Sequence, residues 1–195
     1  QTADEYGLLL ILDEVQSGNG RTGKMWAHEW ADIKPDAIAT AKGIGGGFPM
    51  GAILSTEAAA QGLTPGTHGT TFGGNPLAMA VGNAVMDVIQ APGFLEGVEK
   101  TGQYFWSRLE DLVARHPTVF AAARGAGLMQ GLVCQSDVSN LKVIDALREA
   151  GLLTVGAGEN VIRLLPPLIV TEAQIDEAIA LIDAVAGAWS NDDAA

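Results

Sequence analysis

Residues 8–24 read LLLILDEVQSGNGRTGK, an apolar run followed at once by two carboxylates and a glycine-rich loop. The run LLLIL (8–12) has the length of a strand and contains no polar residue. Such a run is typical of a parallel strand that is buried on both faces. Asp13 then stands at the carboxyl end of the strand, the edge where open α/β sheets bind ligands. The stretch therefore predicts an α/β sheet with a binding site at the end of this strand.

The glycine-rich segment GNGRTGK (18–24) fits the opening of a nucleotide-binding P-loop, G-x-x-x-x-G-K. The next residue is Met25, whose thioether is a poor ligand for the magnesium ion that a P-loop Ser or Thr holds. The carboxylates between the strand and the first glycine would also repel a triphosphate. We therefore interpret the glycines as loop residues, with Arg21 and Lys24 exposed, and expect no ATP binding.

The composition is that of an ordinary globular α/β protein, with 195 residues, of which 48% are hydrophobic and 17% are charged. This length suits one good-sized domain or two small ones. A net charge of −12 gives no electrostatic footprint for nucleic acid or for an anionic membrane. No apolar run approaches the length of a membrane span, so we expect neither kind of partner.

Cys134 is the only cysteine, so the sequence offers no intrachain disulfide and no Cys-rich metal site, and we expect no metal. Both features suit a reducing cytoplasm, with Cys134 as a small core residue. The chain begins with Gln1 rather than Met, and a strand of the buried type starts within ten residues of it. We expect from this a chain cut from a longer protein.

Short apolar runs and helix-end signals predict the elements up to Pro92. DAIAT (36–40) and GAILS (51–55) are strand candidates with a glycine-rich turn between them. Asn75-Pro76 starts a helix, with Asn as N-cap and Pro at the first helical position. The expected apolar stripe of that helix consists of Leu77, Val81, Ala84, Val85 and Val88.

Beyond Pro92 the polar clusters thin out and the pattern alternates between helices and strands. A helix over about 94–115 has its stripe at Leu95, Val98, Phe105, Leu109 and Leu112. Further elements are strands at 127–135, 152–156 and 161–165 and a helix at 140–150. Thr171 and Gln174 have capping-box spacing before a last helix, whose apolar face is Ile175, Ile179, Ile182 and Trp189. The tail after it is expected to fray. The break predicts two domains, a catalytic α/β portion over 1–92 and a smaller α+β domain over 93–195.

Lys42 follows the second strand candidate in TAKGIGGGFP (40–49), among apolar residues and glycines that let the backbone approach a bulky ligand. Taken alone, Lys42 reads as a solvated lysine and Asp13 as a carboxylate that caps a turn. Together they fit pyridoxal phosphate (PLP), which needs a lysine for its Schiff base and an anion opposite its ring nitrogen. A lysine in a poorly hydrated pocket is a usable nucleophile and can then move the proton. We therefore predict a PLP site with Lys42 and Asp13 as catalytic residues.

Three long motifs follow one another, DEVQSGNGRTGK (13–24), TAKGIGGGFPMGA (40–52) and HGTTFGGNPLA (68–78). In order and spacing they closely resemble the class III (ornithine-type) aminotransferases, and within that family the acetylornithine branch. The resemblance covers nearly the whole chain. It implies the C-terminal half of an aspartate-aminotransferase-like (type I) fold: part of the large, PLP-binding domain's sheet over 1–92, and the small α+β domain over 93–195.

The resemblance also implies a role for each matching position. Lys42 matches the Schiff-base lysine, and Asp13 matches the partner of the pyridine nitrogen. The other cofactor positions are Glu14 on the loop or phosphate side, Val15 against a ring face, Gln16 at the ring hydroxyl and Thr71 at the phosphate of the neighbouring subunit. The substrate positions are Thr70 and Arg163, whose guanidinium suits an α-carboxylate. His68 is interpreted as structural.

The activity implied by the resemblance is amino exchange between N2-acetyl-L-ornithine and 2-oxoglutarate in arginine biosynthesis, giving N-acetylglutamate semialdehyde and glutamate, by a homodimer. Since the family's N-terminal half is missing here, we expect a chain that is inactive alone, has open apolar edges at LLLIL, and needs a separate N-terminal-half chain. Two alternatives stay open. The donor is ornithine, succinyl-ornithine, 4-aminobutyrate or another ω-amine, or the chain is an inactive, cofactor-less half-enzyme.

Overall fold

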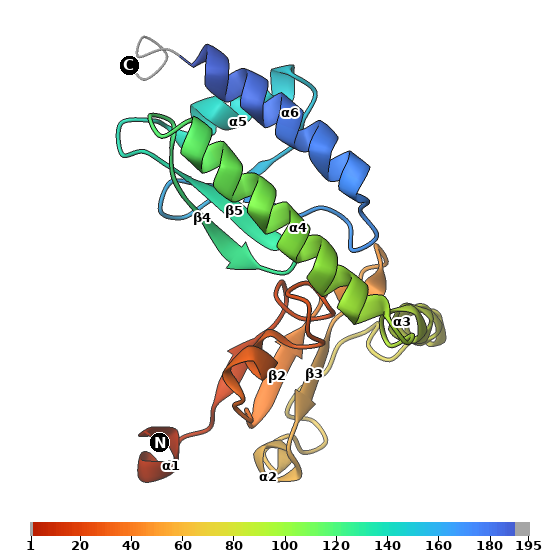
Figure 1. Ribbon diagram of the computed structural model, residues 1–195. Coiled ribbons are helices and arrows are strands. Elements are labelled where there is room, and N and C mark those ends of the chain that lie inside the picture. Colours follow the sequence, from red (N-terminus) through yellow and green to blue (C-terminus); the bar gives the residue numbers. More distant parts are fainter. Residues whose placement is uncertain (1, 190–195) are drawn as a thin grey trace. The chain divides into compact units, whose positions relative to one another are not determined.

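The computed structural model describes residues 2–189 and divides the chain into two compact units, Gln1–Leu95 and Glu96–Ala195 (Figure 1). The first unit holds a three-stranded sheet in the order β1-β2-β3, and the second holds a four-stranded sheet in the order β4-β5-β7-β6. The expectation of a fraying tail concerns residues 190–195, which lie outside the described residues.

The sheet of the first unit consists of β1 (Ile11–Asp13), β2 (Ala37–Thr40) and β3 (Ala52–Ser55). β1 pairs with β2 in parallel, and β2 pairs with β3 antiparallel, which confirms the parallel pairing expected of the first strand. The other elements of this unit are the helices α1 (Thr2–Tyr6), α2 (Glu57–Ala60) and α3 (Pro76–Ile89) and the 3-10 turns η1 (Ala27–Ala31) and η2 (Lys42–Gly45).

The first strand is shorter and more exposed than the sequence predicts. Leu8 and Leu9 precede β1 and are each 59% exposed, and Ile11 within it is 66% exposed. Among the described residues, β1 has a hydrogen-bonded strand neighbour on the β2 side only. The prediction of burial on both faces is therefore wrong, because the elements that would cover the strand are not among these residues. The prediction of an open apolar edge is confirmed.

Helix α3 begins as predicted, since Asn75 Oδ1 accepts the Ala78 N–H at 2.9 Å. Its buried face differs from the predicted stripe, however: Leu77 is exposed, whereas Ala78 is buried. Small residues face the interior because the loop after η2 lies close to the helix. A Cβ on Gly82 would lie 2.9 Å from Met50 Cε, so the glycine lets the end of that methionine approach the helix closely.

The second unit contains four antiparallel strands, β4 (Phe120–Ala126), β5 (Met129–Cys134), β6 (Val155–Ala157) and β7 (Val161–Leu164). Its helices are α4 (Phe94–Arg115), α5 (Asn140–Glu149) and α6 (Glu172–Ala188). Strand β4 is not among the predicted strands. Its sequence FAAARGA contains no β-branched residue, and β4 is an edge strand whose pairing with β5 determines its conformation.

The core of the second unit follows the predicted stripes closely. Four of the expected α4 positions are buried, Val98, Phe105, Leu109 and Leu112. On α6 the isoleucines at 175, 179 and 182 are buried, and Ala186 takes the last inward position instead of Trp189, which is the C-cap. Cys134 is buried as predicted, and burial raises the pKa of its thiol to about 11. No single helix in residues 2–189 is long and apolar enough to cross a membrane. Helices α3 and α4 reach the necessary length and apolar character only if they are counted as one segment across the break between them.

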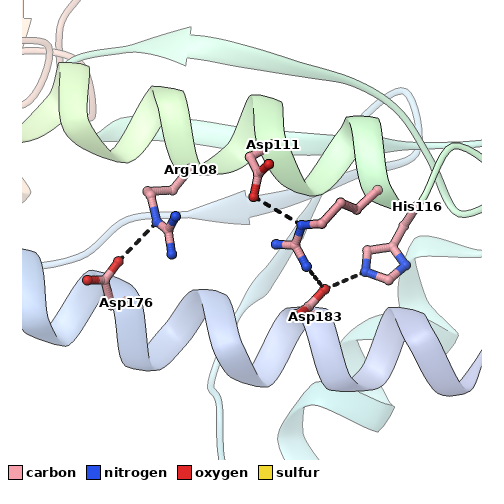
Figure 2. Close-up of polar contacts among 6 residues, drawn as sticks. Arg108, Asp111, His116, Asp176 and Asp183 are labelled. Carbon is pink, nitrogen blue, oxygen red and sulfur yellow. Dashed lines mark hydrogen bonds and ion pairs between the residues drawn. The ribbon is translucent and has the colours of Figure 1, made fainter.

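Polar side chains join α4 to α6 (Figure 2). Arg108 Nε lies 3.0 Å from Asp176 Oδ1, and nearer the end of α4 both Arg115 and His116 contact the carboxylate of Asp183. The hydrogen bond from His116, together with the charge of Arg115, outweighs the small effect of burial and lowers the pKa of Asp183. These pairs are partly exposed, so each contributes only about 0–1 kcal/mol and mainly fixes the register of the two helices.

Candidate active site

Asp13 and Lys42 come from neighbouring parallel strands and stand at the same edge of the sheet. Asp13 is the last residue of β1 and lies opposite Ala39 of β2. Adjacent strands are about 4.8 Å apart, and Lys42 follows directly after the end of β2. Both residues are exposed. The structure thus brings a carboxylate and an amine to the carboxyl ends of two adjacent strands, where ligands bind in open α/β sheets.

The backbone of Lys42 has an unusual conformation. Its φ of 47° lies in the left-handed region, which costs a residue with a Cβ about 1–2 kcal/mol. The residue opens η2, where the Ile44 N–H donates to the Ala41 carbonyl at 3.2 Å and the Gly46 N–H donates to the Gly43 carbonyl at 3.1 Å. Such strain is found at functional sites and persists only where the surroundings enforce it. This conformation distinguishes Lys42 from an ordinary surface lysine.

The Asp13 carboxylate stabilises the turn in which the chain leaves β1. Its Oδ1 accepts the Val15 N–H at 2.9 Å, and the Glu14 N–H donates to the Ala39 carbonyl at 2.9 Å. The carboxylate therefore has a fixed direction at the strand end. Val15 and Gln16, the two further predicted cofactor positions, follow in this turn and are half-buried.

Glu14 points into the loop that follows it. The carboxylate is buried and accepts Ser17 Oγ at 2.6 Å, the Ala27 N–H at 3.1 Å and the His28 N–H at 2.9 Å, and it contacts His28 Nδ1 at 3.1 Å. Burial acts to raise the pKa of Glu14, but these hydrogen bonds together outweigh it and hold the pKa below its ordinary value of 4.5. The ionised carboxylate thus ties η1 and the glycine-rich loop to the end of β1.

Thr70 and Thr71 lie in an exposed segment before α3. The Gly73 N–H donates to the Thr70 carbonyl at 3.4 Å, and Asn75 Nδ2 donates to the Phe72 carbonyl at 2.8 Å, so the segment is organised by local turns. His68 is exposed in the same segment.

Arg163 belongs to the second unit. It lies on β7 opposite Gly131 of β5 and Val155 of β6, and it is half-buried. Its strand neighbours Ile162 and Leu164 are buried, so alternation puts Arg163 on the other face of the sheet.

Residues 1–185 match the family model described as "Aminotransferase class-III". The chain belongs to the class-III aminotransferase family. An acetylornithine aminotransferase of Brucella melitensis is 58% identical over 183 residues, which are 94% of this chain and 45% of that protein. The crystal structure of an acetylornithine aminotransferase from Elizabethkingia anophelis matches with a TM-score of 0.86 at 36% identity, covering 96% of this chain and 47% of that one.

A further similar structure is the ornithine aminotransferase of Toxoplasma gondii, in which PLP partly occupies the active site. It matches with a TM-score of 0.86 at 30% identity, over 94% of this chain and 44% of that one. The chain has a mixed α/β structure and spans about half the length of the curated relatives it matches.

The two side chains at the carboxyl ends of β1 and β2 fit PLP, the cofactor that class-III aminotransferases use. PLP requires an amine and an anion that face opposite ends of one ring, and Lys42 and Asp13 stand on adjacent strand ends. In the turn after Lys42, Gly47 is exposed and has a φ of 112°, which favours glycine.

Sequence reasoning missed the packing of the glycine-rich loop of this class-III chain. Lys24 and Arg21 are not exposed as predicted: Lys24 Nζ lies 4.9 Å from the centre of the Trp30 ring, and burial lowers the pKa of the half-buried Arg21. Asn19 was overlooked altogether. It is buried in the left-handed conformation with a φ of 56°. The sequence does contain a usable signal for this residue, namely an Asn between two glycines. Asn tolerates the left-handed conformation better than most other residues with a Cβ.

Proposed function

We propose that this chain is the C-terminal half of an acetylornithine aminotransferase, which moves the distal amino group of N2-acetyl-L-ornithine to 2-oxoglutarate with PLP as cofactor. The observation that carries the proposal is the pairing of Lys42 with Asp13 at one sheet edge, in a chain 58% identical to an acetylornithine aminotransferase. When bound, PLP supplies an electron sink for the carbon that carries the reacting amine.

In this proposal each site residue of the chain has a distinct role in holding the cofactor or the substrate. The Lys42 amine would anchor the cofactor and would hold or move the proton at the reacting carbon. The Asp13 carboxylate keeps the ring nitrogen protonated, and its bond to the Val15 N–H holds it in direction. The supporting positions are Val15 and Gln16 at the ring, Glu14 behind the loop, Thr71 at a phosphate of the neighbouring subunit, and Thr70 and Arg163 at the substrate.

The second candidate is an aminotransferase for another ω-amine. The match to an ornithine aminotransferase structure favours this reading, at 30% identity. The identity of 58% to an acetylornithine enzyme argues for the acetylated donor. Residues outside this chain share in choosing the donor, because the chain spans about half of the matched relatives.

We further propose that the chain works only with a polypeptide that supplies the other half of the family's sequence, within a homodimer of the whole enzyme. The open side of β1 and its exposed residues Leu8, Leu9 and Ile11 support this, since an uncovered apolar strand edge is a template for pairing. Residues 1–92 would then be part of the PLP-binding domain, and residues 93–195 would form the small domain.

The test uses the chain together with whatever polypeptide copurifies with it. PLP is added, the mixture is reduced with borohydride, and the modified lysine is located by peptide mass spectrometry. We expect the label on Lys42, and we expect Lys42→Ala to abolish both the yellow colour and the label while Lys34→Ala keeps both. A Lys42→Ala protein that keeps its colour would refute the role of Lys42. A coupled glutamate assay then ranks the donors, and equal or faster use of ornithine would select the second candidate.

A further inference from the structure

We propose that Asn19 is a positioning residue for Lys42. Its side chain contacts Thr40 and Ala41 before the lysine and lies beside Gly43 after it, and these contacts fix the turn from which the amine projects. The inference rests on the proposed function of Lys42 as the cofactor anchor. It adds to that function a residue in the loop that begins at Asp13, so that one loop positions both ends of the cofactor.

Asn19 reaches the chain just before Lys42 through its amide nitrogen. Nδ2 donates to Thr40 Oγ1 at 2.8 Å and lies 3.4 Å from the Ala41 carbonyl oxygen. Because a carbonyl oxygen can only accept, the amide must present its nitrogen to this side. Thr40 and Asn19 are both 2% exposed, so water does not replace this hydrogen bond.

Asn19 also contacts the chain just after Lys42. A Cβ on Gly43 would lie 3.3 Å from Asn19 Cβ and 3.7 Å from its amide nitrogen, so the glycine backbone packs directly against this side chain. The residues before and after the lysine therefore both lie beside the buried side chain of Asn19.

This support explains how Lys42 keeps its left-handed backbone. A lysine does not favour a φ of 47° by itself, so the surrounding contacts must enforce it. Asn19 itself has a φ of 56° between Gly18 and Gly20, which directs its side chain from the glycine-rich loop toward β2. Its Oδ1 is buried and accepts no hydrogen bond from residues 2–189, so the interactions of the amide are those of Nδ2.

Two substitutions at Asn19 distinguish the role of its side-chain amide from the role of its left-handed backbone conformation. Asn19→Asp keeps the size of the side chain and its tolerance of the left-handed region, but it turns an acceptor toward the acceptor at Ala41. Asn19→Gly keeps the backbone conformation and removes both contacts. Thr40→Val removes only the hydroxyl that accepts from Nδ2, and it also keeps the test open if an Asn19 variant fails to fold.

The readout is the rate at which Lys42 of the cofactor-free protein becomes labelled. The amine condenses with the aldehyde of added PLP, water leaves, and borohydride reduces the new bond, after which mass spectrometry measures each lysine. Lys34 is the internal control, because it is exposed and precedes the start of β2, whereas Asn19 contacts the residues at the end of that strand. Melting curves verify that each variant is folded.

We expect Asn19→Asp and Asn19→Gly to slow labelling of Lys42 roughly tenfold, the scale of one buried hydrogen bond, with Lys34 unchanged. Thr40→Val should slow it by a smaller factor and add nothing in the Asn19→Gly background, because both remove the same contact. Folded Asn19 variants, or a folded Thr40→Val, that label Lys42 at the wild-type rate would overturn the positioning role. If the label never falls on Lys42, the proposed function itself fails, which is a different result.

Discussion

The two units of this chain differ in how completely each one buries its apolar surface. In the second unit the described residues close a core: Leu109, Leu112 and Leu132 are fully buried, and every one of the largest fully buried side chains belongs to this unit. In the first unit, Leu9 and Ile53 remain 59% and 70% exposed. The unit with the candidate catalytic pair is therefore the one whose packing is incomplete, which is what we expect where the rest of a sheet must be supplied from elsewhere.

The largest effect that tests this contrast is the loss of a core side chain. Leu112→Ala should lower the free energy of unfolding of the second unit by about 2–5 kcal/mol, because it removes buried atoms and leaves a cavity. Ile53→Ala in the first unit should change it by no more than about 0.5 kcal/mol, because the side chain is exposed. Urea unfolding measures both. Equal losses would show that the two units are packed alike.

The open side of β1 offers the second test. Ile11→Glu should leave the melting of the chain alone unchanged, since the side chain is exposed, but should weaken the association with a companion polypeptide roughly a hundredfold by burying a charge there. Binding is measured by titration of the chain against the copurifying partner, with the exposed Leu153→Glu of the second unit as the matched control. Unchanged affinity for Ile11→Glu would mean that the exposed side chain of Ile11 stays uncovered in the complex.

A smaller, local effect is expected at Glu14. Glu14→Gln places an amide N–H₂ where the carboxylate accepts several donors, so one buried backbone N–H loses its partner at a cost of about 1–2 kcal/mol. Because the pKa of Glu14 is lowered by folding, its contribution is present above its ordinary value of 4.5 and is lost as pH falls through the lower folded value. Hydrogen exchange at the backbone N–H groups of Ala27 and His28 measures this change. If the protection of these groups were the same in Glu14→Gln and at acid pH as in the wild type at neutral pH, the prediction would be wrong.

The smallest effect belongs to the partly exposed contacts of α4 and α6. Asp183→Asn should cost at most about 1 kcal/mol, since such pairs are weak in water. The pKa of Asp183 is lowered in the fold, so this contribution is also present at neutral pH and disappears as the carboxylate protonates in acid. Melting temperatures at neutral and acid pH test it, with Asp145→Asn on α5 as a control for a local surface pair. If Asp183→Asn lowered the melting temperature more at acid pH than at neutral pH, the result would contradict this prediction.

What the sequence predicts well is what depends on neighbours along the chain. The Asn75 cap, the Thr171–Gln174 capping box and the stripe of α4 follow from spacing alone and are present in the structure. The positions of Asp13 and Lys42 at strand ends follow from two short apolar runs.

What the sequence did not predict depends on contacts between distant residues. The exposure of LLLIL is set by which strands surround it, and the buried face of α3 is set by Met50 from another loop. Likewise, the hydrogen bond of Asn19 crosses to Thr40, and that of Glu14 crosses to His28. No local pattern encodes these pairings, although the lone Asn between glycines is a usable signal.

A structure of the chain with PLP and with the polypeptide that copurifies with it would show directly whether Lys42 and Asp13 hold the two ends of the cofactor. We expect a covalent link from the cofactor to Lys42 Nζ and a carboxylate oxygen of Asp13 at about 3 Å from the ring nitrogen. A cofactor attached to another lysine, or a ring nitrogen that faces away from Asp13, would contradict it.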